Sequence, residues 1–191
     1  MKLRNLLTMT VISLATVGMA GAQMNDQMST KKDPMVGGAA MYPTKNIVEN
    51  AMNSQDHTTL VAAVKAAGLV ETLEGPGPFT VFAPTNEAFA KLPAGTVDTL
   101  VKPENKDTLT KILTYHVVSG RLSTNDIKKM IKAGKGTAHL STVSGGAITA
   151  TMQGGKIVLT DEKGGTAMIT IANVYQSNGV IQVIDSVLMP N

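Results

Sequence analysis

Histidine is the residue of this chain best suited to metal binding or acid–base chemistry, and the sequence contains three, His57, His116 and His139. No two are spaced as H-x-H or H-x-x-x-H, the separations that place two imidazoles on one face of a strand or a helix. A catalytic zinc site usually takes three protein ligands, with histidine prominent. The chain also has no cysteine to supply a thiolate. The sequence therefore predicts no metal site and no cofactor.

Hydrolytic chemistry would need a nucleophile, a base and an orienting carboxylate. Ser119, His116 and either Asp126 or Asp185 supply those residue types. However, the chain has no G-x-S-x-G segment, which is the turn that exposes a nucleophilic serine in many hydrolases. The paired glycines of the C-terminal third lack the G-x-x-x-x-G-K-[ST] frame of a phosphate-binding loop. We therefore expect a protein that is not an enzyme.

Tyr115 and His116 are the adjacent pair expected to contact a partner, if the chain has a binding site there. A phenol can bury apolar area and an imidazole can both donate and accept hydrogen bonds, so together they could fix the orientation of a partner. The alternative is structural: the pair ends a predicted helix and enters a strand, where His116 would satisfy buried backbone groups. The sequence leaves both interpretations open.

Lysines cluster on one predicted helix, at positions Lys128, Lys129, Lys132 and Lys135. A solvated helix face is the ordinary interpretation, and contact with an anionic surface or a polysaccharide is the alternative. Nucleic acid is not an expected partner, because Arg121 is the one arginine after residue 4 and aromatic residues for base stacking are few.

The N-terminal segment predicts export. Residues 1–22 combine two early basic residues, an apolar run and a small-residue A-x-A site, the pattern of a secretory signal peptide. No second run of about 18 apolar residues follows, so we expect no membrane span after cleavage. The predicted location is secreted or periplasmic, with association with the cell surface as an option.

Residues 23–43 are polar, contain glycine and show no helical or strand period, which indicates a flexible linker. This linker is rich in methionine, at Met24, Met28, Met35 and Met41. Thioether clusters can hold Cu(I), and that is the alternative to a linker that binds nothing.

The rest of the chain, residues 44–191, predicts one domain with helices first and strands last. Apolar residues recur at helical spacing from Ile47 onward, and the strand from Phe79 is followed by Thr85 as a helix N-cap. Glycine pairs then separate short apolar runs in the C-terminal third, as in a β-meander with tight hairpin turns. This order indicates an α+β fold.

Two segments carry a family resemblance, GPFTVFAPTNEAF over residues 77–89 and NGVIQVIDSVLMP over residues 178–190. They resemble the two signature boxes of the fasciclin-like domain. Between them, TYHVVSG over residues 114–120 is similar to the Tyr-His segment of that family. The resemblance implies a twisted β-wedge or sandwich covered by several helices. It places structural roles on the box residues Phe79, Phe82, Pro84, Thr85, Asn86, Phe89, Asn178, Gly179, Gln182 and Asp185.

The resemblance also implies cell adhesion, matrix or surface interaction and, in some members, binding of apolar ligands. The expected function is thus an exported interaction module that binds a surface protein, a matrix component or a polysaccharide. A carrier of a small apolar ligand, such as a lipid or pigment in an inter-helix groove, is the alternative. Two positions depart from the family: Gln182 replaces a common histidine, and Asn173-Val174 replaces the Asp-Ile pair of adhesion-active members. Because Asn173 and Val174 occupy the positions of that pair, they are further candidate partner-binding residues.

Overall fold

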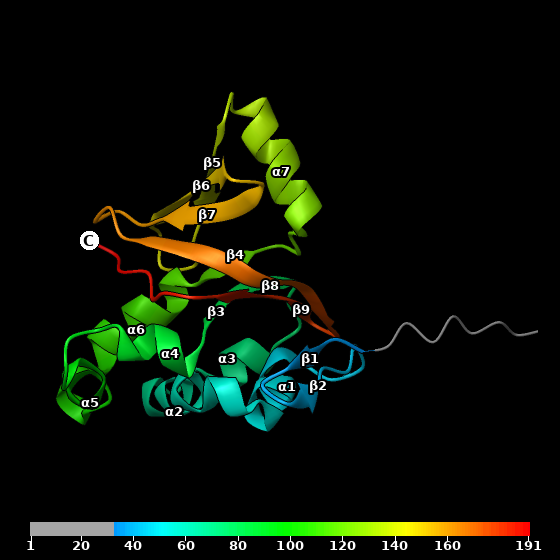
Figure 1. Ribbon diagram of the computed structural model, residues 1–191. Coiled ribbons are helices and arrows are strands. Elements are labelled where there is room, and N and C mark those ends of the chain that lie inside the picture. Colours follow the sequence, from blue (N-terminus) through cyan, green and yellow to red (C-terminus); the bar gives the residue numbers. More distant parts are fainter. Residues whose placement is uncertain (1–32) are drawn as a thin grey trace, which may run out of the picture. The chain divides into compact units, whose positions relative to one another are not determined.

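A computed structural model describes residues 33–191, which form one compact unit (Figure 1). The predicted signal peptide, residues 1–22, lies outside the described residues. So does the first part of the predicted linker, including Met24 and Met28. The Cu(I) alternative, which depends on those methionines, therefore stays a prediction.

The described chain begins with a small hairpin of β1 (Met35–Val36) and β2 (Ala39–Ala40). Val36 and Met41 are only 3% and 2% exposed and belong to the main hydrophobic core. The Gly37 carbonyl oxygen also accepts a hydrogen bond from the Gln55 amide at 3.0 Å. The expected linker over residues 23–43 is therefore wrong at its C-terminal end, because isolated apolar side chains in a glycine-rich segment anchor it to the core.

Between residues 47 and 115 the chain is mostly helical, with one strand, β3 (Phe79–Pro84), in its middle. Asn46 begins the first of them with a capping box, in which its side chain accepts from the Glu49 amide and the Glu49 carboxylate accepts from the Asn46 amide. Gly68 has φ +72° and ends the helix that begins at Thr58. The helices are α1 (Ile47–Asn53), η1 (Gln55–His57), α2 (Thr58–Ala67), α3 (Val70–Glu74), α4 (Asn86–Ala90), α5 (Thr96–Leu100), η2 (Pro103–Asn105) and α6 (Lys106–Tyr115).

One mixed, seven-stranded sheet forms the other layer, in the order β4-β3-β9-β8-β7-β6-β5. Its two edge strands, β4 and β5, are joined by an isolated bridge between Val118 and Thr142, so the sheet is nearly closed. Strand β9 is buried throughout and lies between parallel β3 and antiparallel β8. The strands are β3 (Phe79–Pro84), β4 (Val117–Ser119), β5 (Thr137–Ser141), β6 (Ala147–Gln153), β7 (Lys156–Thr160), β8 (Thr166–Gln176) and β9 (Gly179–Ile184).

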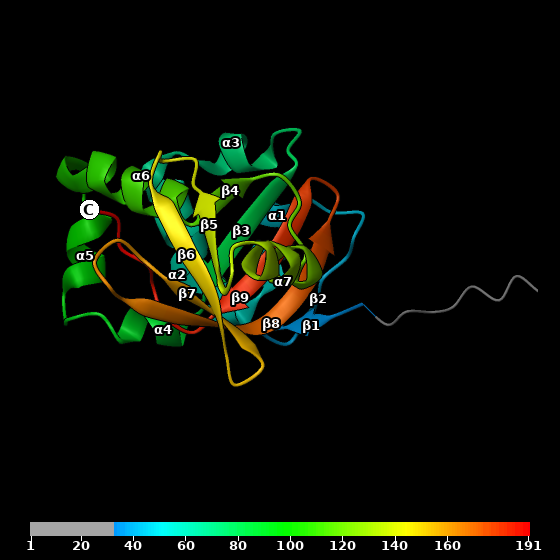
Figure 2. The ribbon, with the colours of Figure 1, turned by 90° about the horizontal axis from the view of Figure 1, so that it is seen from above.

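Two hydrophobic cores lie on opposite sides of this sheet. The first is built by α1, α2, α3 and α6 against β3 and β9, around residues such as Val64, Leu113 and Val183. The second lies under α7 (Thr124–Ala133), whose Ile127 and Ile131 pack onto β5 and β6. Figures 1 and 2 show α7 on the side of the sheet away from the other helices. The predicted α+β class is confirmed.

Candidate functional site

His116 lies at the end of α6 and points into the interior, where it is 2% exposed. Its Nε2 accepts a hydrogen bond from the Leu188 amide at 3.0 Å, so Nε2 carries no proton. Its Nδ1 therefore carries the proton and donates to the Ile112 carbonyl oxygen at 2.9 Å. The ring thus ties the last turn of α6 to the C-terminal segment of the chain.

Burial keeps this imidazole neutral. It lowers the pKa of His116 from the ordinary 6.5 to about 4, because the desolvation of the charged form outweighs the hydrogen bond to Ile112 and the charge of Asp161. At neutral pH His116 is therefore one donor and one acceptor, both used within the fold. Both ring nitrogens are engaged within the fold, so neither is free to exchange a proton with a substrate.

Tyr115 is fully buried beside the second core. Its hydroxyl donates to the Ala147 carbonyl oxygen at 2.7 Å and accepts from the Glu162 amide at 3.3 Å. Burial is the main cause that raises the pKa of the phenol to about 12. Tyr115 therefore joins α6 to the start of β6 and to the β7–β8 turn, and its side chain does not reach the surface.

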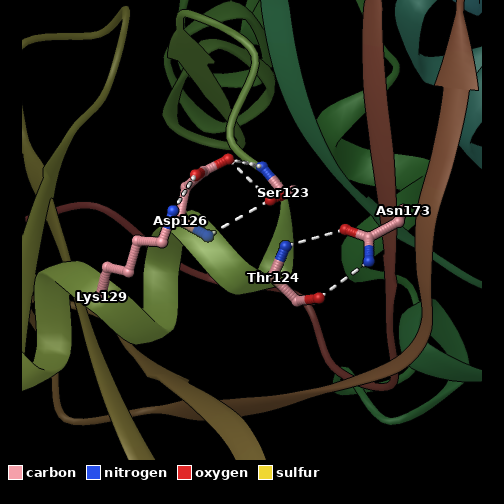
Figure 3. A network of polar contacts seen from close by, with 5 residues as sticks. All are labelled: Ser123, Thr124, Asp126, Lys129 and Asn173. Atoms are coloured by element: carbon pink, nitrogen blue, oxygen red, sulfur yellow. Dashed lines mark hydrogen bonds and ion pairs between the residues drawn. The ribbon is translucent and has the colours of Figure 1, made fainter.

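Asn173 has a left-handed backbone, with φ +59°, at an irregular point of β8. Its Oδ1 accepts from the Thr124 amide at 2.8 Å and its Nδ2 donates to the Thr124 hydroxyl at 2.8 Å, so one side chain holds the first residue of α7 (Figure 3). The same Oδ1 accepts from Gln182 Nε2 at 3.2 Å, and the Asn173 amide donates to Gln182 Oε1 at 2.9 Å. Gln182 also donates to the Leu122 carbonyl oxygen at 3.0 Å.

The two departures from the family pattern, Asn173 and Gln182, thus form one network that fixes α7 on the sheet. The next residue, Val174, is fully buried in the first core. Of the four residues expected to bind a partner, Tyr115, His116 and Val174 are interior, and Asn173 is half-buried with its amide engaged. All four make contacts within the fold, and their partner-binding role stays a prediction.

The N-terminus of α7 is capped a second time, by Ser123. The Ser123 hydroxyl oxygen accepts from the Asp126 amide at 3.2 Å, and the Asp126 carboxylate accepts from the Ser123 amide at 3.0 Å and from its hydroxyl at 2.6 Å (Figure 3). These hydrogen bonds from Ser123 lower the pKa of Asp126. Lys129 lies 3.8 Å from the same carboxylate. The cap of α7 is therefore Ser123, the residue before Thr124.

Replacing Asn173 with alanine is expected to lower the free energy of unfolding by about 2 kcal/mol, since alanine strains the left-handed backbone and leaves the Thr124 amide and the Gln182 side chain without their acceptor. Asn173→Asp is the matched control. It keeps the acceptor at the positive end of α7 and should change stability by less than about 0.5 kcal/mol. Urea unfolding of both variants measures the difference. Equal losses in the two would contradict the assigned role.

The other residues of the two boxes also hold elements together. Thr85 caps α4 through the Ala88 amide, as the sequence predicts. Asn86 accepts from the Thr59 amide at 3.0 Å, which joins α4 to α2. Asp185 accepts from the Met168 amide at 2.8 Å. The remaining apolar members pack in the interior, with Phe79 half-buried and Phe82, Pro84 and Phe89 buried.

Asn178 makes the most widely spread contacts of the second box. Its Oδ1 accepts from the Ile47 amide at 3.1 Å, at the start of α1. Its Nδ2 donates to the carbonyl oxygens of Leu73 and Gly75, at 2.7 and 3.0 Å. Asn178 thus fastens α1 and α3 to the sheet, and nothing in its neighbourhood along the chain indicates that role.

The predicted inter-helix groove corresponds to an apolar cavity among α1, α2, α3 and α6, bordered by Met52, Val61 and Leu113. Its free space is about 30 Å³. That is room for about one or two water molecules, whereas sites for drug-sized ligands measure about 300 Å³ or more. A second apolar cavity, next to His57, has about 20 Å³.

Within residues 33–191, no cluster of three or more histidine, aspartate or glutamate side chains is placed to bind a metal ion. His57 contacts Ser54 through Nδ1 at 2.9 Å, and His139 lies 3.4 Å from the Thr149 hydroxyl on the neighbouring strand. The three histidines thus have separate environments. Within the same range, no helix has the length and apolar character needed to cross a membrane.

A nearly closed mixed sheet with helices on both sides, fastened by asparagine and glutamine side chains, defines a small α+β domain of the wedge-like sandwich class. The chain belongs to the fasciclin domain family, because the model of that domain matches residues 55–190. The resemblance carried by the two boxes is therefore confirmed.

Similar proteins span most of the chain. Protein sll1483 of Synechocystis is 44% identical over 181 residues, which cover 95% of this chain and 93% of that protein. The cell surface glycolipoprotein MPB83 of Mycobacterium bovis is 36% identical over 160 residues, covering 81% of this chain and 64% of the relative. The FAS1 domain pair of the insect cell adhesion molecule fasciclin I has the same fold, with a TM-score of 0.68 at 19% identity over 77% of this chain and 51% of that one.

Proposed function

We propose that this protein is an exported, non-enzymatic module that mediates adhesion or protein binding at a cell surface or in an extracellular matrix. The observation that carries the proposal is the fasciclin match over residues 55–190, which is most of the folded unit. Fasciclin I is an insect cell adhesion molecule and MPB83 is a cell surface glycolipoprotein. Both descriptions agree with the secreted or periplasmic location that residues 1–22 predict.

The interior supports the non-enzymatic part of the proposal. Burial keeps His116 neutral and Tyr115 protonated across the physiological range, and both side chains use their polar atoms inside the fold. Catalytic acids and bases usually lie in a cleft with a pKa near the working pH. Tyr115 is buried away from any such cleft, His116 borders only the apolar cavity of about 30 Å³ among the helices, and the pKa of neither side chain lies near neutral pH.

The carrier alternative has less support. The inter-helix cavity of about 30 Å³ would have to widen about tenfold to hold a lipid or a pigment, which means separating α1 and α2 from the first core. A carrier isolated from its native source would bring an extractable ligand in about equimolar amount. An adhesion module would not.

Surface capture tests the proposal. The chain from residue 23 onward is immobilised, and cells and an envelope fraction of the source organism are passed over it. We expect retention that saturates and that the free protein competes away, with no ligand in an organic extract of the native protein. The absence of retention would overturn the proposal, and an equimolar extracted ligand would favour the carrier.

A further inference from the structure

Charge is distributed unevenly over this fold. Residues 121–160, which include α7, β5, β6 and β7, contain six basic side chains and one carboxylate, Asp126. Residues 44–115, which supply the helices of the first core, contain six lysines and eight carboxylates. The side of the sheet that α7 covers is thus the basic one, and the opposite side is weakly acidic.

Lysines from two separate elements meet beside α7. Lys128 on α7 and Lys156 at the start of β7 line one surface depression with a volume of about 170 Å³. Thr124, Gly155, Ala172 and the apolar residues Ile157 and Ile169 also line it. Lys132 lies one helical turn after Lys128, on the same face of α7. We call Lys128, Lys132 and Lys156, together with this depression, the basic face.

The charges of the basic face are not neutralised within the fold. All three of its lysines are exposed, and the ion pair found among residues 33–191 joins Asp126 to a different lysine, Lys129. The Thr124 hydroxyl oxygen accepts from Asn173, which leaves its own proton available to a ligand. The depression therefore offers two ammonium groups and a hydroxyl donor in one wall, and no carboxylate lines it.

The side chains around the basic face favour a polysaccharide over nucleic acid or lipid as the anionic partner. Residues 121–160 contain no Phe, Tyr or Trp side chain, so nucleic-acid bases would find no stacking platform. Of the large apolar side chains of α7, Ile127 and Ile131 are buried against the sheet and Met130 is exposed as a single residue, so this helix has no continuous apolar face to insert into a lipid bilayer. A polymer of sugars offers carboxylate or sulfate groups for the lysines and hydroxyl groups for the threonine and the backbone.

We propose that the basic face binds an acidic polysaccharide. The inference rests on the proposed function, because it names the partner class through which this module would attach to a surface or matrix. Lysines act here as hydrated point charges, so each contact contributes modestly and several act together. Binding should weaken steeply with salt, since exposed charges are screened over about 8 Å at physiological ionic strength.

The test compares two triple variants of the full mature chain on immobilised heparin and on polygalacturonate, a polymer with carboxylates alone. The first variant is Lys128→Gln, Lys132→Gln and Lys156→Gln. The matched control changes Lys65, Lys102 and Lys106 to glutamine, which removes the same charge from exposed positions of the helices on the other side of the sheet. We expect the first variant to bind at least tenfold more weakly and the control to stay within twofold of wild type. Unchanged thermal unfolding checks that both are folded.

Three results would overturn this inference: no binding of wild type to either polymer at 150 mM salt, an equal loss in the two variants, or tighter binding to phosphatidylglycerol vesicles than to the polysaccharides. The surface-capture experiment separates this outcome from failure of the proposed function. If wild type and the basic-face variant adhere equally well to native cells, the module adheres by another surface and the polysaccharide assignment is wrong. If wild type does not adhere at all, the proposed function itself fails.

Discussion

Replacing His116 with alanine is expected to lower the free energy of unfolding by about 4 kcal/mol, one of the largest single effects in this protein. The change leaves a cavity and deprives the Ile112 carbonyl oxygen and the Leu188 amide of their buried partners. His116→Gln keeps an amide donor and an acceptor and should lose about half as much. Urea unfolding at pH 7.5 measures both. A loss below about 1 kcal/mol in the alanine variant would contradict the structural role.

The same histidine predicts a pH dependence with a definite sign. Its pKa is about 4 in the folded protein, against an ordinary value of 6.5, so the unfolded chain takes up the proton first as the pH falls. The stabilising contribution is complete above about pH 6.5, is lost as the pH falls to about 4, and amounts to about 3 kcal/mol over that window. His57 acts in the same direction, since burial also lowers its pKa. His116→Gln should therefore flatten the wild-type profile, and identical slopes would refute the assignment.

Replacing Gly179 with alanine is expected to cost at least about 3 kcal/mol, because the new methyl group has no space. A Cβ at this position would lie 2.2 Å from the Phe79 carbonyl oxygen, across the parallel β3–β9 pair, and 2.9 Å from Ile47 Cδ1. Thermal unfolding should show a clear fall in melting temperature.

Gly154→Asn is the matched control for this prediction. Gly154 lies in the β6–β7 turn with φ +55°, a Cβ added there would have no neighbour within 4 Å, and asparagine tolerates that backbone. Its effect should stay under about 1 kcal/mol. Equal stability of the two glycine variants would contradict the claim that Gly179 is required because β3 lies too close for a side chain.

Local chemistry predicted much of this fold. Thr85 caps its helix as expected, and Gly154-Gly155 forms the expected tight turn with positive φ at both residues. The sequence also contains a signal for Asn46 as a cap, in Glu49 three residues later. Such features depend on neighbours along the chain and can be inferred without the tertiary structure.

Features that depend on distant segments could not be inferred in this way. The turn before β9 consists of Ser177 and Asn178, and Gly179 begins β9 where β3 leaves no room for a side chain. Tyr115 and His116 are buried because their polar atoms find partners in Ala147 and Leu188. Those partners are distant in the sequence and become neighbours only in the folded protein. The cluster of lysines on α7 could be predicted from the sequence. That Lys156 lies beside them could not, since no local pattern links a helix to a later turn.

Tyr115 and His116 lie in the interior, whereas the proposed adhesion is mediated by surface residues. The most direct test measures adhesion of native cells to the double variant Tyr115→Phe, His116→Gln, at a temperature where circular dichroism shows the variant to be folded. We predict adhesion equal to that of wild type, together with a lower unfolding free energy. Loss of adhesion by a variant that circular dichroism shows to be folded at that temperature would contradict this account.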